Sequence, residues 1–125
     1  MELSAALVPD AASLADERPI DLVHLARMTL GDRSLEREVL ELFDRQAGIL
    51  IVRMQQTARA GIGATAHTLK GSARGIGAWR VARAAEVVEK AADEAGEPEL
   101  TAAVRRLGAA AEESRALIAD LLRAS

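Results

Sequence analysis

Apolar residues recur along most of this chain at three- and four-residue intervals, the spacing of helices that bury one face. The spacing predicts helices over residues 22–29, 33–58, 64–75 and 78–95, and from Pro98 onward. In the 33–58 helix the periodic apolar positions are Leu35, Val39, Leu42, Phe43, Leu50, Met54 and Ala58. In the last helix such positions repeat every seven residues, which is typical of helices packed at a shallow angle. The chain is therefore predicted to be all-α.

The two ends of the chain differ in how clearly they are patterned. Residues 1–19 have little periodicity, and we expect a tail or a short helix there. Residues 20–125 are long enough for one domain with one core. Gly61 and Gly63 interrupt the apolar pattern, so we expect the central helix to begin only at about Ala64.

Composition excludes several classes of function. Half of the residues are hydrophobic but only 2% are aromatic, and cysteine is absent, which excludes thiol chemistry and disulfides. A net charge of −3 and the lack of aromatic stacking surfaces argue against binding of nucleic acid. No apolar run approaches the roughly 20 residues of a membrane span, and no secretory leader is evident. We expect a cytoplasmic protein without membrane contact.

The charge is unevenly distributed along the chain. Between Arg59 and Lys90 there are six basic residues and two acidic ones, so this segment carries a local charge of +4. Such a cationic zone would favour an anionic group or an acidic partner surface. The alternative, that these basic residues merely form solvated helix faces, fits this count equally well.

The residues around His67 suit phosphoryl chemistry. Lys70 follows one helical turn later, and Gly71 leaves the backbone bare directly above the imidazole, although glycine in a helix costs about 1 kcal/mol relative to alanine. If the following turn is centred on Ala78, then Glu89 lies opposite His67 in an antiparallel hairpin. A carboxylate on one ring nitrogen fixes the tautomer and leaves the other nitrogen as a nucleophile. We predict that His67 carries a phosphoryl group and that Lys70 offsets its charge.

At these residues the chain closely resembles the histidine-containing phosphotransfer (HPt) domain family of bacterial phosphorelays. The resemblance covers about residues 20–122 and is carried by Ala66-His67-Thr68-Leu69-Lys70-Gly71-Ser72-Ala73, Gly77-Ala78, Val81 and Glu89. It implies an antiparallel up-down four-helix bundle with an additional short N-terminal helix. It also implies that His67 takes a phosphoryl group from a receiver-domain aspartate and passes it to another, with Glu89 orienting the ring.

The resemblance further implies how the protein would work with partners. These would be response-regulator receiver domains and a hybrid histidine kinase, and the receiver would supply the magnesium ion, so no cofactor or metal is expected in this chain. The chain would be a phosphoryl carrier without kinase activity of its own, and we expect a monomer. Docking is predicted to centre on Gly71, with contacts from Leu22, Ile62, Ala64, Arg74 and Arg83.

Three other functions fit the sequence less well. The phosphoacceptor domain of a sensor kinase has an acidic residue after its histidine and a proline soon afterwards, whereas Thr68 follows here and the next proline is Pro98. A helical adaptor that binds an acidic partner without phosphorylation is the main alternative. A hydrolase with His67 as general base is disfavoured, because no serine, cysteine or aspartate lies at a suitable spacing from this histidine.

Overall fold

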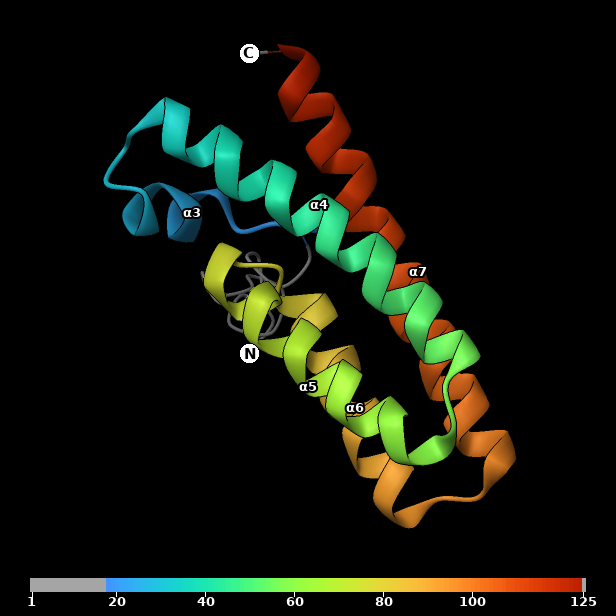
Figure 1. Cartoon of the computed structure of the whole chain (residues 1–125). Coiled ribbons are helices and arrows are strands. Elements are labelled where there is room, and N and C mark those ends of the chain that lie inside the picture. Colours follow the sequence, from blue (N-terminus) through green and yellow to red (C-terminus); the bar gives the residue numbers. More distant parts are fainter. Residues whose placement is uncertain (1–17, 125) are drawn as a thin grey trace, which may run out of the picture.

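The computed structural model describes residues 18–124, and helices joined by short turns make up this part of the chain. It consists of α3 (Leu22–Met28), α4 (Arg33–Gln56), α5 (Arg59–Ile76), α6 (Trp79–Glu94) and α7 (Glu97–Ala124), with no strand among the described residues. Figure 1 shows the long helices packed along one another, with α3 across one end of α4 and α5. The all-α prediction is confirmed. Apart from Arg18 and Pro19, the predicted tail or short helix over residues 1–19 lies outside the described residues.

Apolar side chains from every helix form one continuous core. Its largest fully buried members include Ile20, Met54, Leu69, Leu107 and Ile118. The seven-residue repeat of α7 faces this core, and even its polar member Ser114 is fully buried. Because a buried hydroxyl needs a partner, Ser114 donates a hydrogen bond of 3.0 Å to the carbonyl of Pro19. This bond ties the segment before α3 to the last helix.

The predicted start of the central helix at Ala64 is wrong, because α5 begins at Arg59 and runs through Gly61 and Gly63. The reason is local packing. A Cβ atom at Gly61 would collide with the Thr57 side chain, so a glycine lets the helix begin close to the preceding turn. Thr65 also donates a hydrogen bond of 2.8 Å to the Gly61 carbonyl. Glycine here permits a close approach and does not end the helix.

The turn between α5 and α6 fixes the hairpin that carries the site. Gly77 ends α5 in the left-handed conformation with φ of 82°, which favours glycine. The Asp21 amide donates to the Gly77 carbonyl at 2.9 Å, and the Trp79 indole donates to the Asp21 carboxylate at 3.0 Å. His24 packs edge-on against Trp79 and hydrogen-bonds the Gly75 carbonyl through Nε2 at 3.2 Å. These contacts hold α3 against the end of α5.

Gly48, in the middle of α4, has a structural reason that the sequence pattern does not reveal. A Cβ atom there would lie 3.1 Å from the guanidinium of Arg115 on α7. That guanidinium forms an ion pair of 2.8 Å with Asp44 on α4 and a second of 3.1 Å with Glu112. The glycine therefore makes room for the cation that links α4 to α7.

None of the helices described between residues 18 and 124 is long and apolar enough to span a membrane.

Candidate functional site

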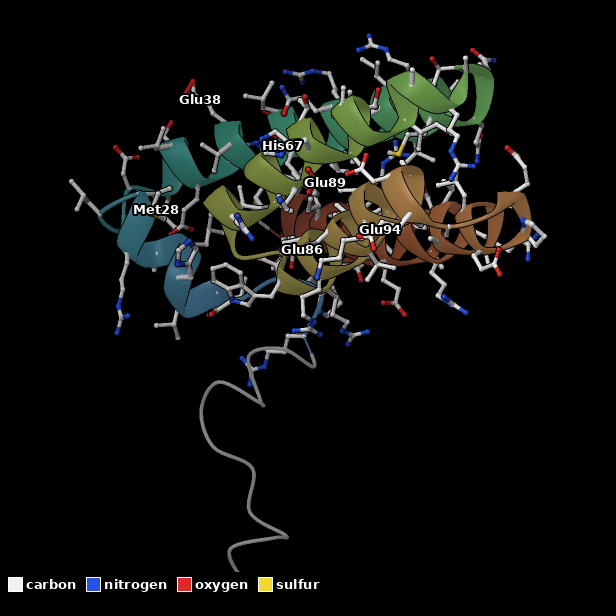
Figure 2. The ribbon with its side chains drawn as sticks, turned by 90° about the horizontal axis from the view of Figure 1, so that it is seen from below. Met28, Glu38, His67, Glu86, Glu89 and Glu94 are labelled. Atoms are coloured by element: carbon white, nitrogen blue, oxygen red, sulfur yellow. The ribbon has the colours of Figure 1, made fainter. Side chains whose placement is uncertain are left out.

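The α5–α6 hairpin places His67 directly opposite Glu89. Nδ1 of His67 lies 2.8 Å from Oε2 of Glu89, so the predicted reach of this carboxylate to the imidazole is confirmed. The His67 side chain is 69% exposed, whereas the Glu89 side chain is only 24% exposed. Figure 2 shows the two side chains projecting from neighbouring helices. The ring is thus open to solvent, and its Nδ1 atom is held by Glu89.

Lys70 contacts the same carboxylate through its other oxygen. Its Nζ atom lies 2.5 Å from Oε1 of Glu89, in an ion pair rather than an aligned hydrogen bond. The Lys70 side chain is only 12% exposed, although it lies one helical turn from the exposed His67. Lys70 is tucked between α5 and α6 because its carboxylate partner lies there. One carboxylate therefore connects the cation to the imidazole.

Glu89 is ionised at neutral pH despite its position between two helices. Burial acts to raise the pKa of this carboxyl, but the contacts with Lys70 and His67 outweigh it and lower the pKa below the ordinary 4.5. An ionised carboxylate can only accept hydrogen bonds, so the hydrogen of a neutral imidazole sits on Nδ1. The lone pair of Nε2 then faces away from Glu89 and is available to an incoming electrophile.

Small residues surround the imidazole and leave the approach to it open. A Cβ atom at Gly71, one helical turn from His67, would meet nothing within 4 Å. Beside the ring, a shallow hollow of about 840 Å³ is lined by Arg59, Ala60, Gly63, Ala64, Thr68, Ala92 and Asp93 together with His67 and Glu89. A partner surface can therefore reach Nε2 without displacing a large side chain.

The structure does not bring all the predicted docking residues together. Gly71, Ala64 and Arg74 are exposed on α5, as predicted. Ile62, however, is half-buried and packs against the core. Leu22 lines a different hollow, which is formed with α4 and the end of α7, so it is not part of the His67 surface.

Two of the six basic residues of the predicted cationic zone pair with acidic residues outside the segment, Arg59 with Glu97 and Arg80 with Glu113. Arg59 donates to the carbonyls of Ala91 and Ala92 at 3.0 Å each, and to that of Ala95, at the end of α6. Arg80 forms an ion pair of 2.8 Å with Glu113. Lys70 is paired with Glu89. A count along the sequence does not include Glu97 and Glu113, so the local excess of positive charge is smaller than predicted.

The two arginines of the predicted docking rim lie together beyond Gly71. Arg74 and Arg83 line a small hollow between α5 and α6 with Trp79, Ala82 and Glu86. Arg74 is exposed on the same helix as His67, two turns further along. Positive charge near the site thus concentrates on this side of the imidazole.

A groove between α3, α4 and α5 was not predicted from the sequence. It encloses about 290 Å³ and is lined by apolar residues of three helices, among them Met28, Leu35, Val39, Leu42 and Ile76. Ser72 and Gly75 border it on α5, and Ser72 donates a hydrogen bond of 3.0 Å to Gln46 on α4. Leu35 and Leu42 belong to the apolar period of α4, yet both are exposed at this groove.

Among residues 18–124, no three His, Cys, Asp or Glu side chains gather in a way that could hold a metal ion.

A model of the Hpt domain family matches residues 33–124, which include the whole hairpin around His67. No curated protein and no solved structure matches the chain. Because the family match spans α4 to α7, the helices that build the site just described, this chain belongs to the Hpt domain family, whose members carry phosphoryl groups on histidine in phosphorelays.

Proposed function

We propose that His67 is the phosphoryl carrier of this Hpt domain and shuttles the group between aspartates of receiver domains. The observation that supports this most strongly is the exposed imidazole whose Nδ1 is held by the ionised carboxylate of Glu89. Among the described residues, His24 is the other histidine, and its Nε2 already bonds a backbone carbonyl. His67 has a free nitrogen and an open approach.

The transfer step follows from this geometry. The lone pair of Nε2 attacks the phosphorus of a receiver's aspartyl phosphate, an N–P bond forms, and the P–O bond to the aspartate breaks and returns a free carboxylate. The Nδ1 hydrogen stays in place, so the ring becomes a phosphorylated imidazolium. Glu89 stabilises the positive charge that develops on the ring. In the reverse step the phosphoryl group leaves and the ring becomes neutral again.

Cations near the site serve the added phosphoryl group. Lys70 is held by Glu89 one helical turn from His67, and Arg74 is exposed on the same helix. Together they would offset the negative charge of the group. The divalent metal ion and the remaining catalytic groups would come from the receiver domain, so this chain would act as a carrier and not as a kinase.

Partner recognition would use the small-residue surface around the imidazole. Gly71 at its centre and Ala64 beside it leave room for the receiver's active-site loops, and Arg74 and Arg83 border it. The partners would be response-regulator receiver domains and a hybrid histidine kinase in the cytoplasm. We also propose that α4 to α7 form the antiparallel up-down bundle expected of the family, with α3 as the additional N-terminal helix.

Phosphotransfer from a labelled receiver tests this proposal. A receiver domain carrying a ³²P-labelled aspartyl phosphate is incubated with the full chain, with His67→Gln and, as a matched control, with His24→Gln. We expect label that is labile in acid and stable in base on the wild type and on His24→Gln, and none on His67→Gln. Binding of the receiver without any label on the wild type would favour the adaptor function instead.

A further inference from the structure

Residues 1–17, which lie outside the described residues, account for the net negative charge of the chain. They contain four acidic residues, Glu2, Asp10, Asp16 and Glu17, and neither lysine nor arginine. Residues 18–125 contain fifteen acidic and sixteen basic residues, which leaves this part with a net charge of +1. Such a separation of charge within one short chain favours contact between the acidic segment and an exposed basic surface.

A basic surface of this kind lies between α5 and α6. Arg74 and Arg83 are exposed and line a hollow of about 170 Å³ with Trp79 and Glu86, which we call the arginine hollow. Arg74 forms no ion pair with any other residue between 18 and 124. Figure 2 shows Glu86 on the same side of α6 as Glu89. Two guanidinium groups and a single carboxylate line the hollow, so it retains positive charge for an acidic partner.

The segment that leads back to residues 1–17 is anchored near the arginine hollow. The carbonyl of Pro19 accepts a hydrogen bond of 3.0 Å from Ser114 on α7. The neighbouring Glu113 forms an ion pair of 2.8 Å with Arg80 on α6. Arg83 follows Arg80 by one turn of the same helix. The chain therefore approaches α3 from the side of the bundle on which Arg83 is exposed.

We propose that Asp16 and Glu17 dock on the arginine hollow of their own chain and form ion pairs with Arg74 and Arg83. Both acidic residues lie within three residues of Pro19, so the chain keeps them within about 10 Å of that anchored position. Carboxylate and guanidinium groups form the strongest type of charged hydrogen bond between side chains. Because both groups belong to one chain, the contact forms at a high effective concentration.

The docked segment lies at the edge of the surface proposed for receiver docking. Arg74 is one helical turn from Gly71 and two turns from His67 on α5. A receiver that docks over Gly71 and pairs with this arginine first displaces the acidic segment. The segment thus acts as an internal competitor that weakens receiver binding. This consequence rests on the proposed function, whereas the docking of the segment does not.

Trp79 gives a direct measurement of whether the hollow is occupied, because it lines the hollow and is the only tryptophan of the chain. The chain also has no cysteine, so Ser13→Cys in the full chain takes a single nitroxide label, which quenches tryptophan fluorescence on contact. We expect Trp79 fluorescence of the labelled protein to be quenched at low salt. It should recover in about 1 M sodium chloride, where the Debye length falls to about 3 Å.

Removal of charge from the segment distinguishes docking from mere proximity. In the labelled protein, Asp16→Asn combined with Glu17→Gln should lose most of the quenching. Glu94→Gln combined with Glu99→Gln removes the same charge from exposed positions elsewhere, and this matched control should retain the quenching. Quenching that is unchanged by salt and by the first pair of substitutions would overturn the proposal. Quenching that rises with protein concentration would also overturn it, because the segment would then bind a second copy.

Transfer from a receiver that carries a ³²P-labelled aspartyl phosphate tests the competition. At receiver concentrations below saturation, the protein with Asp16→Asn and Glu17→Gln should accept label about two- to tenfold faster than the wild type and the control, as expected from the loss of two surface ion pairs. Equal rates would overturn the competition. If the wild type accepts no label while the quenching depends on charge, the proposed phosphotransfer fails and the docking of the segment is supported.

Discussion

The ammonium of Lys70 lies 2.5 Å from one oxygen of Glu89, and the other oxygen of that carboxylate holds His67. Glu89 is therefore shared between a partly buried cation and an exposed imidazole. The pairing with Lys70 keeps the carboxylate ionised, and the ionised carboxylate fixes which ring nitrogen carries hydrogen. The reactivity of Nε2 of His67 thus depends on Lys70, which acts on the ring through Glu89.

Replacement of Glu89 separates its charge from its hydrogen bond. Glu89→Gln can still accept a hydrogen bond from Nδ1, but it cannot stabilise a positive ring, so we expect phosphotransfer from a receiver to slow by about tenfold. Glu89→Ala should slow it further. Initial rates of label transfer measure the effect, and ¹⁵N NMR of the ring gives an independent measure of its tautomer. A Glu89→Ala protein with the wild-type tautomer and rate would show that the carboxylate does not position the ring.

The lowered pKa of Glu89 predicts a pH-dependent contribution to stability. A carboxyl whose pKa is lower in the folded than in the unfolded protein stabilises the fold above the unfolded value, here about 4.5. This contribution is lost as the pH falls through the folded pKa. We expect the free energy of unfolding of the wild type to exceed that of Glu89→Gln at pH 7, and the gap to shrink below about pH 4.5. Urea titrations of both proteins at several pH values measure the gap, which should not widen in acid.

Gly71 should show opposite effects on stability and on transfer. Nothing lies within 4 Å of an added Cβ atom, so Gly71→Ala should stabilise the helix by about 0.5–1 kcal/mol. Gly71→Leu should also fold normally, but its side chain would cover the approach to His67 and reduce phosphotransfer at least about tenfold. Urea denaturation and transfer rates are measured on both variants. Ala116→Leu, on an exposed position of α7, is the size-matched control. Unimpaired transfer by Gly71→Leu would contradict docking over this glycine.

Arg59 should matter for stability and not for chemistry. Its guanidinium donates to the carbonyls of Ala91, Ala92 and Ala95, which end α6, and it forms an ion pair of 3.7 Å with Glu97. Arg59→Ala removes these donors from partly buried carbonyls, so we expect a loss of about 2 kcal/mol in the free energy of unfolding. Arg105→Ala, on an exposed position of α7, should change it little. A large loss of phosphotransfer in a folded Arg59→Ala protein would assign this arginine to the site.

The positions of most helices and the contact between Glu89 and His67 could be predicted from the sequence. Apolar periodicity located the five helices between residues 18 and 124, because each buries one face. Counting from the turn at Ala78 placed Glu89 opposite His67, because residues equidistant from a short turn meet in an antiparallel hairpin. The predicted start of α5 is wrong, because the glycines in the pattern indicate a break in the helix. Gly61 instead makes room for the Thr57 side chain, which only the packing of the folded chain reveals.

Other features depend on partners that are distant in sequence. The +4 charge of the central segment is reduced, because Arg80 pairs with Glu113 on α7 and Arg59 pairs with Glu97. Leu35 and Leu42 follow the apolar period of α4 but lie at the edge of its buried face, where the neighbouring helices leave a groove. Such outcomes depend on how the helices pack, which periodicity within one helix does not determine.

Location of the phosphoryl group after transfer tests the central claim most directly. The full chain is phosphorylated by a receiver domain, and ³¹P and ¹⁵N NMR together with mass spectrometry identify the modified atom. We predict one phosphoryl group, on Nε2 of His67, and its absence from His67→Gln. A group on Nδ1 or on another residue, or the same amount of acid-labile phosphate in His67→Gln, would contradict the account.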